Sequence, residues 1–343
     1  MNENVKNDRL RPRLEKFDKI IFDMDGVITS EYMYWEAAAL TVYDLLFSYE
    51  KFGKRDIDRE YCLKNRADLV NAILCHRKTV AAVKALGVNT NWDLAYIIFC
   101  VSIYKNHKLE NMDEWHFESV RMFIENIETK APELYDLAAE LASLGTSRPK
   151  EYFVRGGDGL WKELVNTFQR WFLGDTDLEG LNAYETPLLE LNDIKKTLES
   201  LKNMGARLGI GTGRPRAEIM TPLKKWGIDG YFEPGMIATY DDVLKAEKDL
   251  SPELPIAKPH PYVFIKAVFG EKLTDKQILD GLTSGCDMSK TLVVGDAPSD
   301  LMAAKTAGMK FFGVLSGVDK ESARKYFREN GADYIFDDIT YMV

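Results

Sequence analysis

Short apolar runs, closed by polar residues or glycine, occur near the start of the chain and through its C-terminal half. Runs of this kind predict strands that are buried on both faces. In the C-terminal half they alternate with helical segments, which indicates a parallel sheet covered by helices. The predicted fold class is therefore α/β, with a Rossmann-like parallel sheet. The predicted strands are residues 20–22, 208–212, 236–239, 291–295, 311–314 and 334–336.

The region between the first two predicted strands has a different pattern. Its apolar residues recur at helical spacing, as in Leu69, Ile73, Val80 and Val83, and no convincing strand interrupts them. The predicted helices span residues 34–49, 67–86, 91–104, 118–127, 133–144 and 160–172. This region is predicted to be an all-helical insertion.

The first strand needs partners, and the helical region offers none. We therefore predict a discontinuous core made of residues 1–30 and 186–343, with residues 31–185 inserted as a helical cap. Pro187 is expected to start the next helix, and Gly205 to end it. Residues 1–18 are polar and are predicted to form a frayed arm.

Composition narrows the class of protein. The 343 residues are 45% hydrophobic, enough for a large core, and 45 Lys and Arg face 54 Asp and Glu, for a net charge of −9. This acidity argues against a nucleic-acid partner. No long apolar span and no secretory signal occur, which predicts a cytoplasmic protein without membrane contact. Oligomeric state stays open.

The cysteines also favour a reducing compartment. They form no Cys-x-x-Cys pair and lack metal-finger spacing, so they are interpreted as ordinary thiols. The four are Cys62, Cys75, Cys100 and Cys286.

Two acidic side chains, Asp23 and Asp25, directly follow the first predicted strand, and Gly26 allows a sharp turn after them. Ligands of open α/β sheets bind at the carboxyl ends of strands. Two neighbouring carboxylates repel each other unless a cation or proton is close. The pair suits a nucleophile beside a general acid/base. An acidic surface loop remains the alternative for this motif alone.

Two further motifs carry groups that bind phosphate. Thr212 ends the second predicted strand, and its hydroxyl with the backbone N–H of Gly213 could hold a phosphate oxygen. A plain turn is the alternative, because Gly213 and Pro215 favour turns. Lys258 precedes Pro259, which restricts the backbone there, and its ammonium could neutralise a phosphate. Alone this signal is weak, because most lysines are merely solvated.

Asp296 follows the strand at residues 291–295, and Asp300 opens the next helix. Oxygen ligands of this kind suit Mg²⁺, which keeps several waters and takes few carboxylates. A helix N-cap is the alternative for Asp300, and both roles are compatible. Mg²⁺ is therefore the predicted cofactor.

In this order the segments resemble the four motifs of the haloacid dehalogenase superfamily, in its phosphoglycolate phosphatase and β-phosphoglucomutase-like branch. The resemblance covers the core, and the cap matches only in position and helical character. The matching segments are Asp23-Met-Asp25-Gly-Val, Thr212 after an apolar strand, Lys258-Pro, and Gly295-Asp296 with Asp300.

The resemblance implies a role for each residue. Asp23 would attack phosphorus and form an aspartyl-phosphate, and Asp25 would protonate the leaving oxygen and then activate water. Thr212 and Gly213 would hold phosphate oxygens, while Lys258 would steady the charge. These roles agree with the needs of phosphoryl transfer, which are positioning and charge neutralisation.

The metal site is implied in the same way. Asp296 would bind Mg²⁺ directly, and Asp300 directly or through water. Asp23 and the backbone carbonyl of Asp25 would complete the protein ligands.

An acid/base at position 25 favours hydrolysis of a small phosphorylated metabolite. A phosphomutase is the main alternative, because Asp-Met-Asp-Gly-Val-Ile-Thr closely resembles the start of β-phosphoglucomutase. That mutase has a histidine about a dozen residues after the nucleophile, but here none occurs before His76. A catalytically silent binding protein is the third hypothesis.

The helical cap is expected to choose the substrate, because a closing cap expels water from the reaction. Arg155, in Arg-Gly-Gly-Asp-Gly, could pair with an anionic substrate group. A simple glycine-rich connection between helices is the alternative interpretation.

Overall fold

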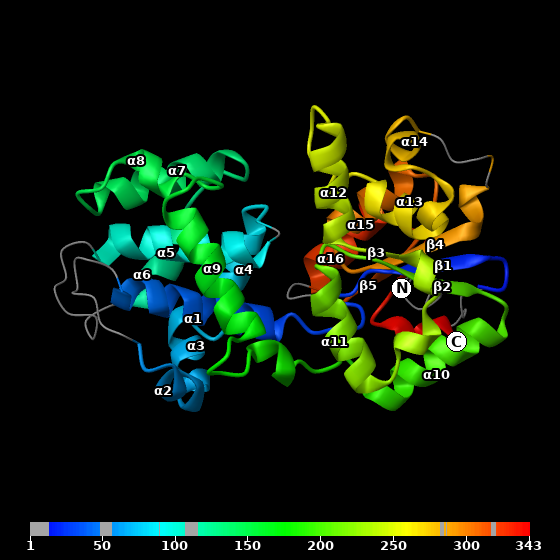
Figure 1. Cartoon of the computed structure of the whole chain (residues 1–343), viewed down its shortest axis with the longest axis horizontal. Coiled ribbons are helices and arrows are strands. Elements are labelled where there is room, and N and C mark those ends of the chain that lie inside the picture. The colour runs from blue at the N-terminus through cyan, green and yellow to red at the C-terminus, as the bar shows by residue number, and fades with distance from the viewer. Residues whose placement is uncertain are drawn as a thin grey trace, which may run out of the picture. The chain divides into compact units, whose positions relative to one another are not determined.

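The computed structural model describes residues 14–48, 57–88, 90–106, 116–281, 285, 287–316 and 320–343. The chain divides into two compact units (Figure 1): Met1–Ser30 with Glu185–Val343, called the core unit here, and Glu31–Tyr184, called the helical unit. The domain division expected from the sequence differs from this one only in the assignment of Glu185.

The core unit contains one sheet of six parallel strands in the order β3-β2-β1-β4-β5-β6. The first strand of the chain lies between β2 and β4, so the nucleophile candidate that follows it is central in the sheet. The predicted α/β fold class is confirmed. The strands are β1 Lys19–Phe22, β2 Arg207–Gly211, β3 Ile237–Ala238, β4 Thr291–Gly295, β5 Lys310–Val314 and β6 Tyr334–Phe336.

Alternate residues of the buried strands belong to two separate hydrophobic clusters. In β1, Ile20 and Phe22 belong to one cluster and Ile21 to the other, as expected where successive side chains point to opposite faces. Both clusters are buried. This explains why the strands appear in the sequence as continuous apolar runs rather than as alternating ones.

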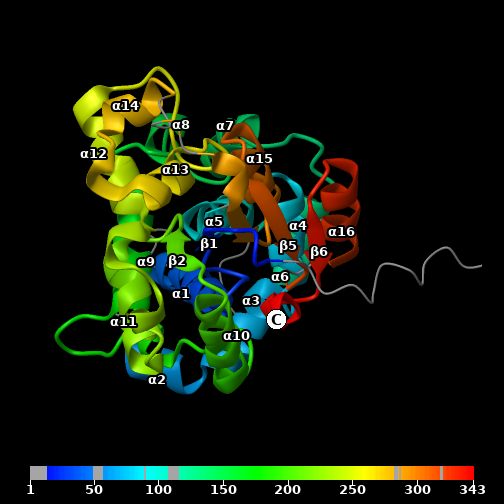
Figure 2. The same cartoon turned by 90° about the vertical axis from the view of Figure 1, so that its right-hand side faces the viewer.

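Helices cover both faces of the sheet. Residues of α10 and α11 pack on the face of Phe22, and residues of α12, α13, α15 and α16 on the face of Ile21. Figure 2 shows α10 on one side of the strands and α13 and α15 on the other. The helices of this unit are α10 Leu191–Asn203, α11 Arg216–Trp226, α12 Tyr240–Leu250, α13 Tyr262–Phe269, α14 Asp275–Leu279, α15 Pro298–Thr306 and α16 Lys320–Glu329.

Two predictions about the ends of core elements were wrong. Leu14 and Phe17 are 2% and 3% exposed and join the hydrophobic core, so residues 14–18 are not a frayed arm. Residues 1–13 lie outside the described residues. Helix α10 begins at Leu191 rather than at Pro187. Pro187 instead forms a bridge with Thr29, beside a hydrogen bond from Leu188 N to Ile28 O of 2.8 Å.

The helical unit has its own hydrophobic core around α5, whose residues from Leu94 to Val101 are all buried. Tyr34 stacks on Phe172 with ring centroids 4.1 Å apart, which supports a packing role for the early aromatic residues. The helices are α1 Tyr32–Ser48, α2 Arg59–Lys64, α3 Arg66–Leu74, α4 Lys78–Ala85, α5 Asn91–Asn106, α6 Phe117–Glu125, α7 Glu133–Leu144, α8 Lys150–Phe153 and α9 Leu160–Leu173.

The single helix predicted over residues 67–86 is wrong, because it is divided into α3 and α4. Cys75, His76 and Arg77 separate the two, with φ angles of 47°, 53° and 72°. Three successive residues in the left-handed region end a right-handed helix. Non-glycine residues rarely adopt this conformation, and neither Gly nor Pro marks the break in the sequence.

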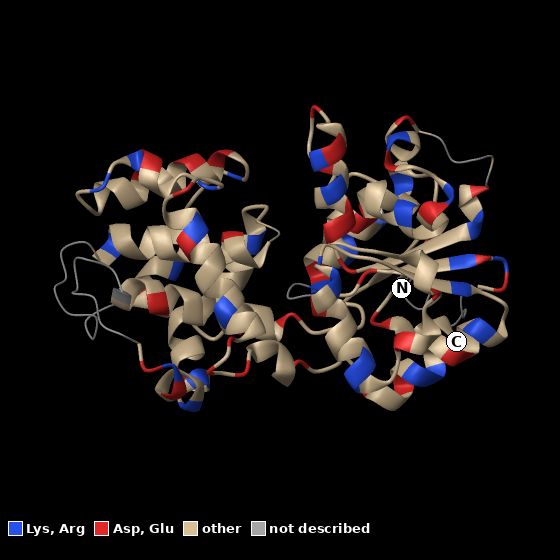
Figure 3. Ribbon diagram, in the orientation of Figure 1, with Lys and Arg blue, Asp and Glu red and all other residues tan. Residues whose placement is uncertain are grey.

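The described cysteines are buried free thiols, and burial raises the pKa of the Cys62 thiol to about 11. Cys286 lies outside the described residues. Among those residues, no helix combines the length and apolar character needed to cross a membrane. Figure 3 shows Lys and Arg interspersed with Asp and Glu on the helices of both units.

Candidate active site

Asp23 lies directly beyond β1 and is 8% exposed. Its backbone N–H donates to the carbonyl of Val294 in β4 at 2.8 Å, which continues the pairing of the strands past Phe22. Gly26 then turns the chain with a φ of +69°, and its N–H donates to Thr29 O at 2.9 Å. The Asp23 carboxylate is thus fixed at the carboxyl edge of the sheet.

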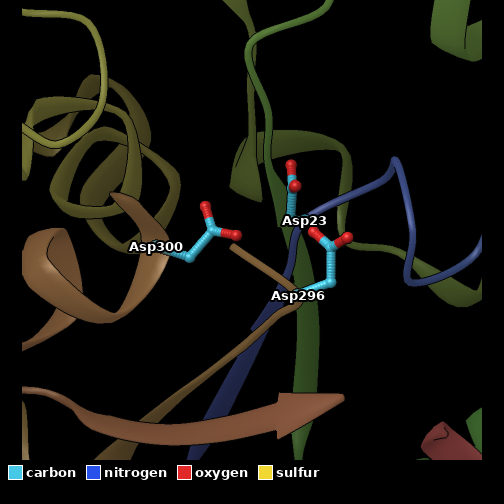
Figure 4. A group of neighbouring side chains, drawn as sticks. All are labelled: Asp23, Asp296 and Asp300. Carbon is cyan, nitrogen blue, oxygen red and sulfur yellow. The ribbon is translucent and has the colours of Figure 1, made fainter. Parts of the chain in front are cut away.

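Three carboxylates converge at this edge (Figure 4): Asp23 after β1, Asp296 after β4 and Asp300 from the first turn of α15. Their ligand oxygens all lie within 4.8 Å of one another. We call these residues the aspartate cluster. The chain makes room for it at Gly26, where a Cβ atom would lie only 2.1 Å from Asp296 Oδ2.

Lys258 brings a positive charge into the aspartate cluster. Its Nζ lies 2.8 Å from Asp23 Oδ1 and 2.8 Å from Asp300 Oδ1. Burial by itself would lower the pKa of this ammonium, but the two carboxylates outweigh burial and raise it above its ordinary value. Lys258 is therefore paired with two carboxylates at the site, rather than solvated.

Asp300 caps a helix and also lies in the aspartate cluster. Its Oδ2 accepts a hydrogen bond from Ala297 N at 3.2 Å, at the start of α15. Burial raises the pKa of Asp300 to about 6, although Lys258 acts in the opposite direction. The charge of Asp23 adds to the rise, as expected for carboxylates that share a small volume.

Thr212 follows β2, the strand that pairs with β1. Its side chain is buried, and its Oγ1 accepts a hydrogen bond from Arg214 N at 3.2 Å. Open space surrounds the position where a side chain of Gly213 would lie. A group could therefore approach the backbone of this turn without a steric barrier from Gly213.

The Asp25 carboxylate makes a second set of contacts. Its Oδ1 accepts from Thr29 Oγ1 at 2.9 Å and lies 3.3 Å from Arg214 Nε. Arg214 also pairs with Glu185 through Nη2. Burial raises the pKa of the Glu185 carboxyl, and the charge of Arg214 partly counteracts it. Sequence reasoning missed Arg214 and Glu185, because a single charged residue carries no periodic or spacing signal.

The donor set fits a hard divalent cation. Carboxylate oxygens from three segments of the chain face a common volume, without His or Cys among the described candidates. This is the chemistry that suits Mg²⁺ rather than a softer metal. The buried like charges also favour a bound cation, because their mutual repulsion would fall.

Arg155, the cap residue predicted to contact substrate, lies in the helical unit and engages Asp93. Its Nη2 is 3.0 Å from Asp93 Oδ2, and its guanidinium lies over the rings of Tyr135 and Trp161 at 4.6 and 5.0 Å. Asp93 is 1% exposed. These contacts favour the interpretation of Arg155 as part of a connection between helices.

Comparison with known proteins agrees with the fold. Residues 17–308 match the family described as haloacid dehalogenase-like hydrolase. A phosphoglycolate phosphatase of Pasteurella multocida is 29% identical over 44% of this chain and 54% of its own length. The pyrophosphatase PpaX of Bacillus velezensis is 31% identical over 50% of this chain and 67% of its own length.

The similarity to the phosphoglycolate phosphatase thus spans about half of that protein. A structural comparison extends further along the chain. An X-ray structure from the Northeast Structural Genomics Consortium superposes with a TM-score of 0.74 and 26% identity, covering 94% of this chain and 96% of the other.

Proposed function

Because the chain belongs to the haloacid dehalogenase-like hydrolase family, we propose that it hydrolyses a small phosphate ester with Asp23 as the nucleophile. The observation that carries this proposal is the position of the Asp23 carboxylate. It ends the central strand, contacts Lys258 at 2.8 Å and shares its volume with two other carboxylates. Phosphoryl transfer requires this combination of positioning and charge neutralisation.

In the proposed reaction, an oxygen of Asp23 attacks the phosphorus atom and the bond to the leaving oxygen breaks. The phosphoryl group is then held on Asp23 as an acyl phosphate, until water attacks phosphorus and returns the free carboxylate. Lys258 neutralises charge on the transferring group throughout. The Thr212 hydroxyl and the Gly213 backbone N–H would hold its remaining oxygens.

Asp25 would act as the general acid and base. It gives a proton to the leaving oxygen in the first step and takes a proton from the attacking water in the second. Its carboxylate is partly exposed and is held by Thr29 and Arg214. Both contacts fix the orientation of the Asp25 carboxylate, which lies close in sequence to the nucleophile Asp23.

The aspartate cluster and the backbone carbonyl of Asp25 would hold Mg²⁺. The bound ion would supply charge neutralisation for the phosphoryl oxygens. Asp300 already forms an ion pair with Lys258 and accepts a hydrogen bond from Ala297, so it would also contribute by fixing the other ligands.

The substrate class is a small phosphorylated metabolite. Phosphoglycolate and inorganic pyrophosphate are the first compounds to test, because similar proteins are described as phosphoglycolate phosphatase and pyrophosphatase. We assign substrate selection to the helical unit, whose connections to the core near Ser30 and Thr186 would act as hinges.

The test is release of phosphate from 4-nitrophenyl phosphate and from a set of phosphorylated metabolites, with Mg²⁺ and with excess chelator. We expect release that requires the metal and is strong for one metabolite class. Full activity in chelator would contradict the metal assignment.

A phosphomutase remains the second candidate, because the motif after β1 resembles that of β-phosphoglucomutase. Both reactions would form the same phosphorylated Asp23 and differ in whether water or a sugar phosphate accepts the group. Incubation with β-glucose 1-phosphate, a trace of the bisphosphate and Mg²⁺ separates them. Glucose 6-phosphate formed faster than free phosphate would favour the mutase.

A further inference from the structure

A buried arginine lies between the acid/base candidate and the point where the chain returns from the helical unit. Arg214 is 3% exposed, and its Nε is 3.3 Å from Asp25 Oδ1. Its Nη2 pairs with Glu185, the first residue of the core unit after the helical unit. Burying a guanidinium is costly unless charged partners compensate for the lost hydration, and two carboxylates do so here.

The backbone of Arg214 is fixed from both sides. Its N–H donates to Thr212 Oγ1 at 3.2 Å, and its carbonyl accepts from Tyr240 N at 3.0 Å. Pro215, the next residue, caps the start of α11. The side chain therefore leaves a rigid turn, and this turn is the one that carries the predicted phosphate contacts.

Glu185 holds the other end of the guanidinium. Its carboxylate is 3% exposed and accepts from Arg214 Nη2. The guanidinium is planar, so contacts at both Nε and Nη2 fix its orientation about the long axis of the side chain. Glu185 thus fixes the direction in which Arg214 Nε faces Asp25.

At Asp25 the contacts converge on one oxygen. Oδ1 accepts the Thr29 hydroxyl at 2.9 Å and faces Arg214 Nε. Rotating the carboxylate would break both contacts. The Thr29 hydroxyl is itself local to the same turn, whereas Arg214 ties Asp25 to a distant part of the chain.

We propose that Arg214 is a positioning residue, held by Glu185, that orients the Asp25 carboxylate toward the leaving oxygen of the substrate. This inference rests on the proposed function, in which Asp25 transfers a proton to that oxygen. It predicts that loss of Arg214 weakens acid catalysis specifically, rather than phosphate binding.

Leaving-group dependence tests this role. Phenolate is a poor leaving group that needs protonation, whereas 4-nitrophenolate leaves readily without it. For Arg214→Gln we expect kcat/KM for phenyl phosphate to fall about 100-fold, within the range of general acid catalysis, and that for 4-nitrophenyl phosphate to fall about tenfold or less. Arg214→Lys should recover part of the loss, because it keeps the charge without the fork.

Arg216→Gln is the matched control. Arg216 is two residues away and exposed, and its guanidinium donates to Ile237 O at 3.2 Å rather than to Asp25. This variant should keep the wild-type ratio of the two substrates. The comparison therefore removes the general effect of losing an arginine from this turn.

Arg214→Gln alone leaves Glu185 buried without its main cation and is expected to lower stability. The double variant Arg214→Gln with Glu185→Gln removes both charges and should recover stability in urea unfolding. Its altered substrate ratio should persist, because Asp25 still lacks its anchor. A double variant that is stable and has the wild-type ratio would overturn the proposal.

The Asp25→Asn variant distinguishes two outcomes: that only the positioning role of Arg214 is wrong, or that the proposed function is wrong. If Asp25→Asn discriminates strongly against phenyl phosphate and the Arg214 variants do not, only the positioning role is wrong. If wild-type protein with Mg²⁺ releases phosphate from neither compound, the proposed function is wrong and the positioning role falls with it.

Discussion

Each unit of the protein holds a charged cluster, and the two clusters differ in how their charges are balanced. In the core unit, the aspartate cluster gathers three like charges within 4.8 Å of one another. In the helical unit, Asp93 meets the opposite charge of Arg155 and also accepts from Thr90 Oγ1 at 2.8 Å and Tyr135 OH at 3.3 Å. Burial and the nearby Asp93 charge raise the pKa of Tyr135 to about 12.

Gathering like charges in a buried site lowers stability, and pairing opposite charges avoids that cost. The cluster around Asp93 is therefore explained by folding alone. In the aspartate cluster, Lys258 offsets part of the repulsion between Asp23 and Asp300, and the gathering of three carboxylates supports the proposed cation site. The difference distinguishes the candidate active site from the ion pair of Asp93 and Arg155.

The largest expected effect comes from replacing the nucleophile. Asp23→Asn should lower kcat for 4-nitrophenyl phosphate by at least about 10⁴-fold, since an amide cannot form the acyl phosphate. Steady-state phosphate release measures this, with circular dichroism as the control for folding. A rate near that of the wild type would remove Asp23 from the mechanism.

The structural cluster should respond in stability rather than in rate. Asp93→Asn leaves Arg155 without its carboxylate and should cost about 2–3 kcal/mol, below the full value for a buried pair because Arg155 is partly exposed. Urea unfolding measures this cost. Turnover of 4-nitrophenyl phosphate per folded molecule should not change.

Arg155→Gln sharpens the same comparison. It should also lower stability without raising KM for the substrate found in the metabolite screen. A rise in KM with unchanged stability would instead support the prediction that Arg155 contacts the substrate.

Metal binding should stabilise the protein through the aspartate cluster only. At a Mg²⁺ concentration 100 times the dissociation constant, the free energy of unfolding should rise by about 2.7 kcal/mol. Asp296→Asn should lose most of this gain and Asp93→Asn should keep it. Equal stabilisation of all three proteins in thermal unfolding would contradict the assigned ligands.

The smallest effect is expected at Asp44, a half-buried carboxylate of the helical unit, which accepts from Trp171 Nε1 at 3.1 Å. Burial raises the pKa of Asp44, so the folded protein binds its proton at higher pH than the unfolded chain does. Wild-type protein therefore loses stability as pH rises from the unfolded pKa through the folded one.

Asp44→Asn keeps an acceptor for Trp171 and has no charge to bury. It should be slightly more stable than the wild type at neutral pH, and the difference should vanish below the unfolded pKa of Asp44. Urea unfolding between pH 3 and pH 7 gives the curve. A difference that grows toward low pH would show that the sign is wrong.

The strands were predictable because each is a short apolar run, and every one of the six was found near its expected residues. The break at residues 75–77 could not be predicted. Cys, His and Arg rarely adopt left-handed backbone angles, so this conformation depends on tertiary contacts rather than on local preference. Leu14 and Phe17 were missed because two apolar residues in a polar segment show no period.

The candidate site likewise contains residues that the sequence predicts and residues that it does not. Asp23, Lys258, Asp296 and Asp300 were predicted from motifs at strand ends and in loops, and the structure brings their side chains together. The role of Arg214 was not predicted, because its partners Asp25 and Glu185 are distant in sequence. Such pairs can be identified only in the folded chain.

The central claim is that Asp23 carries the phosphoryl group, and trapping that group tests it most directly. Asp25→Asn, which should slow hydrolysis of the intermediate, would be mixed with Mg²⁺ and 4-nitrophenyl phosphate, quenched and reduced with borohydride. Mass spectrometry should then find homoserine at position 23, the product of reducing an aspartyl-phosphate. Reduction at another carboxylate, or none while phosphate is still released, would contradict the account.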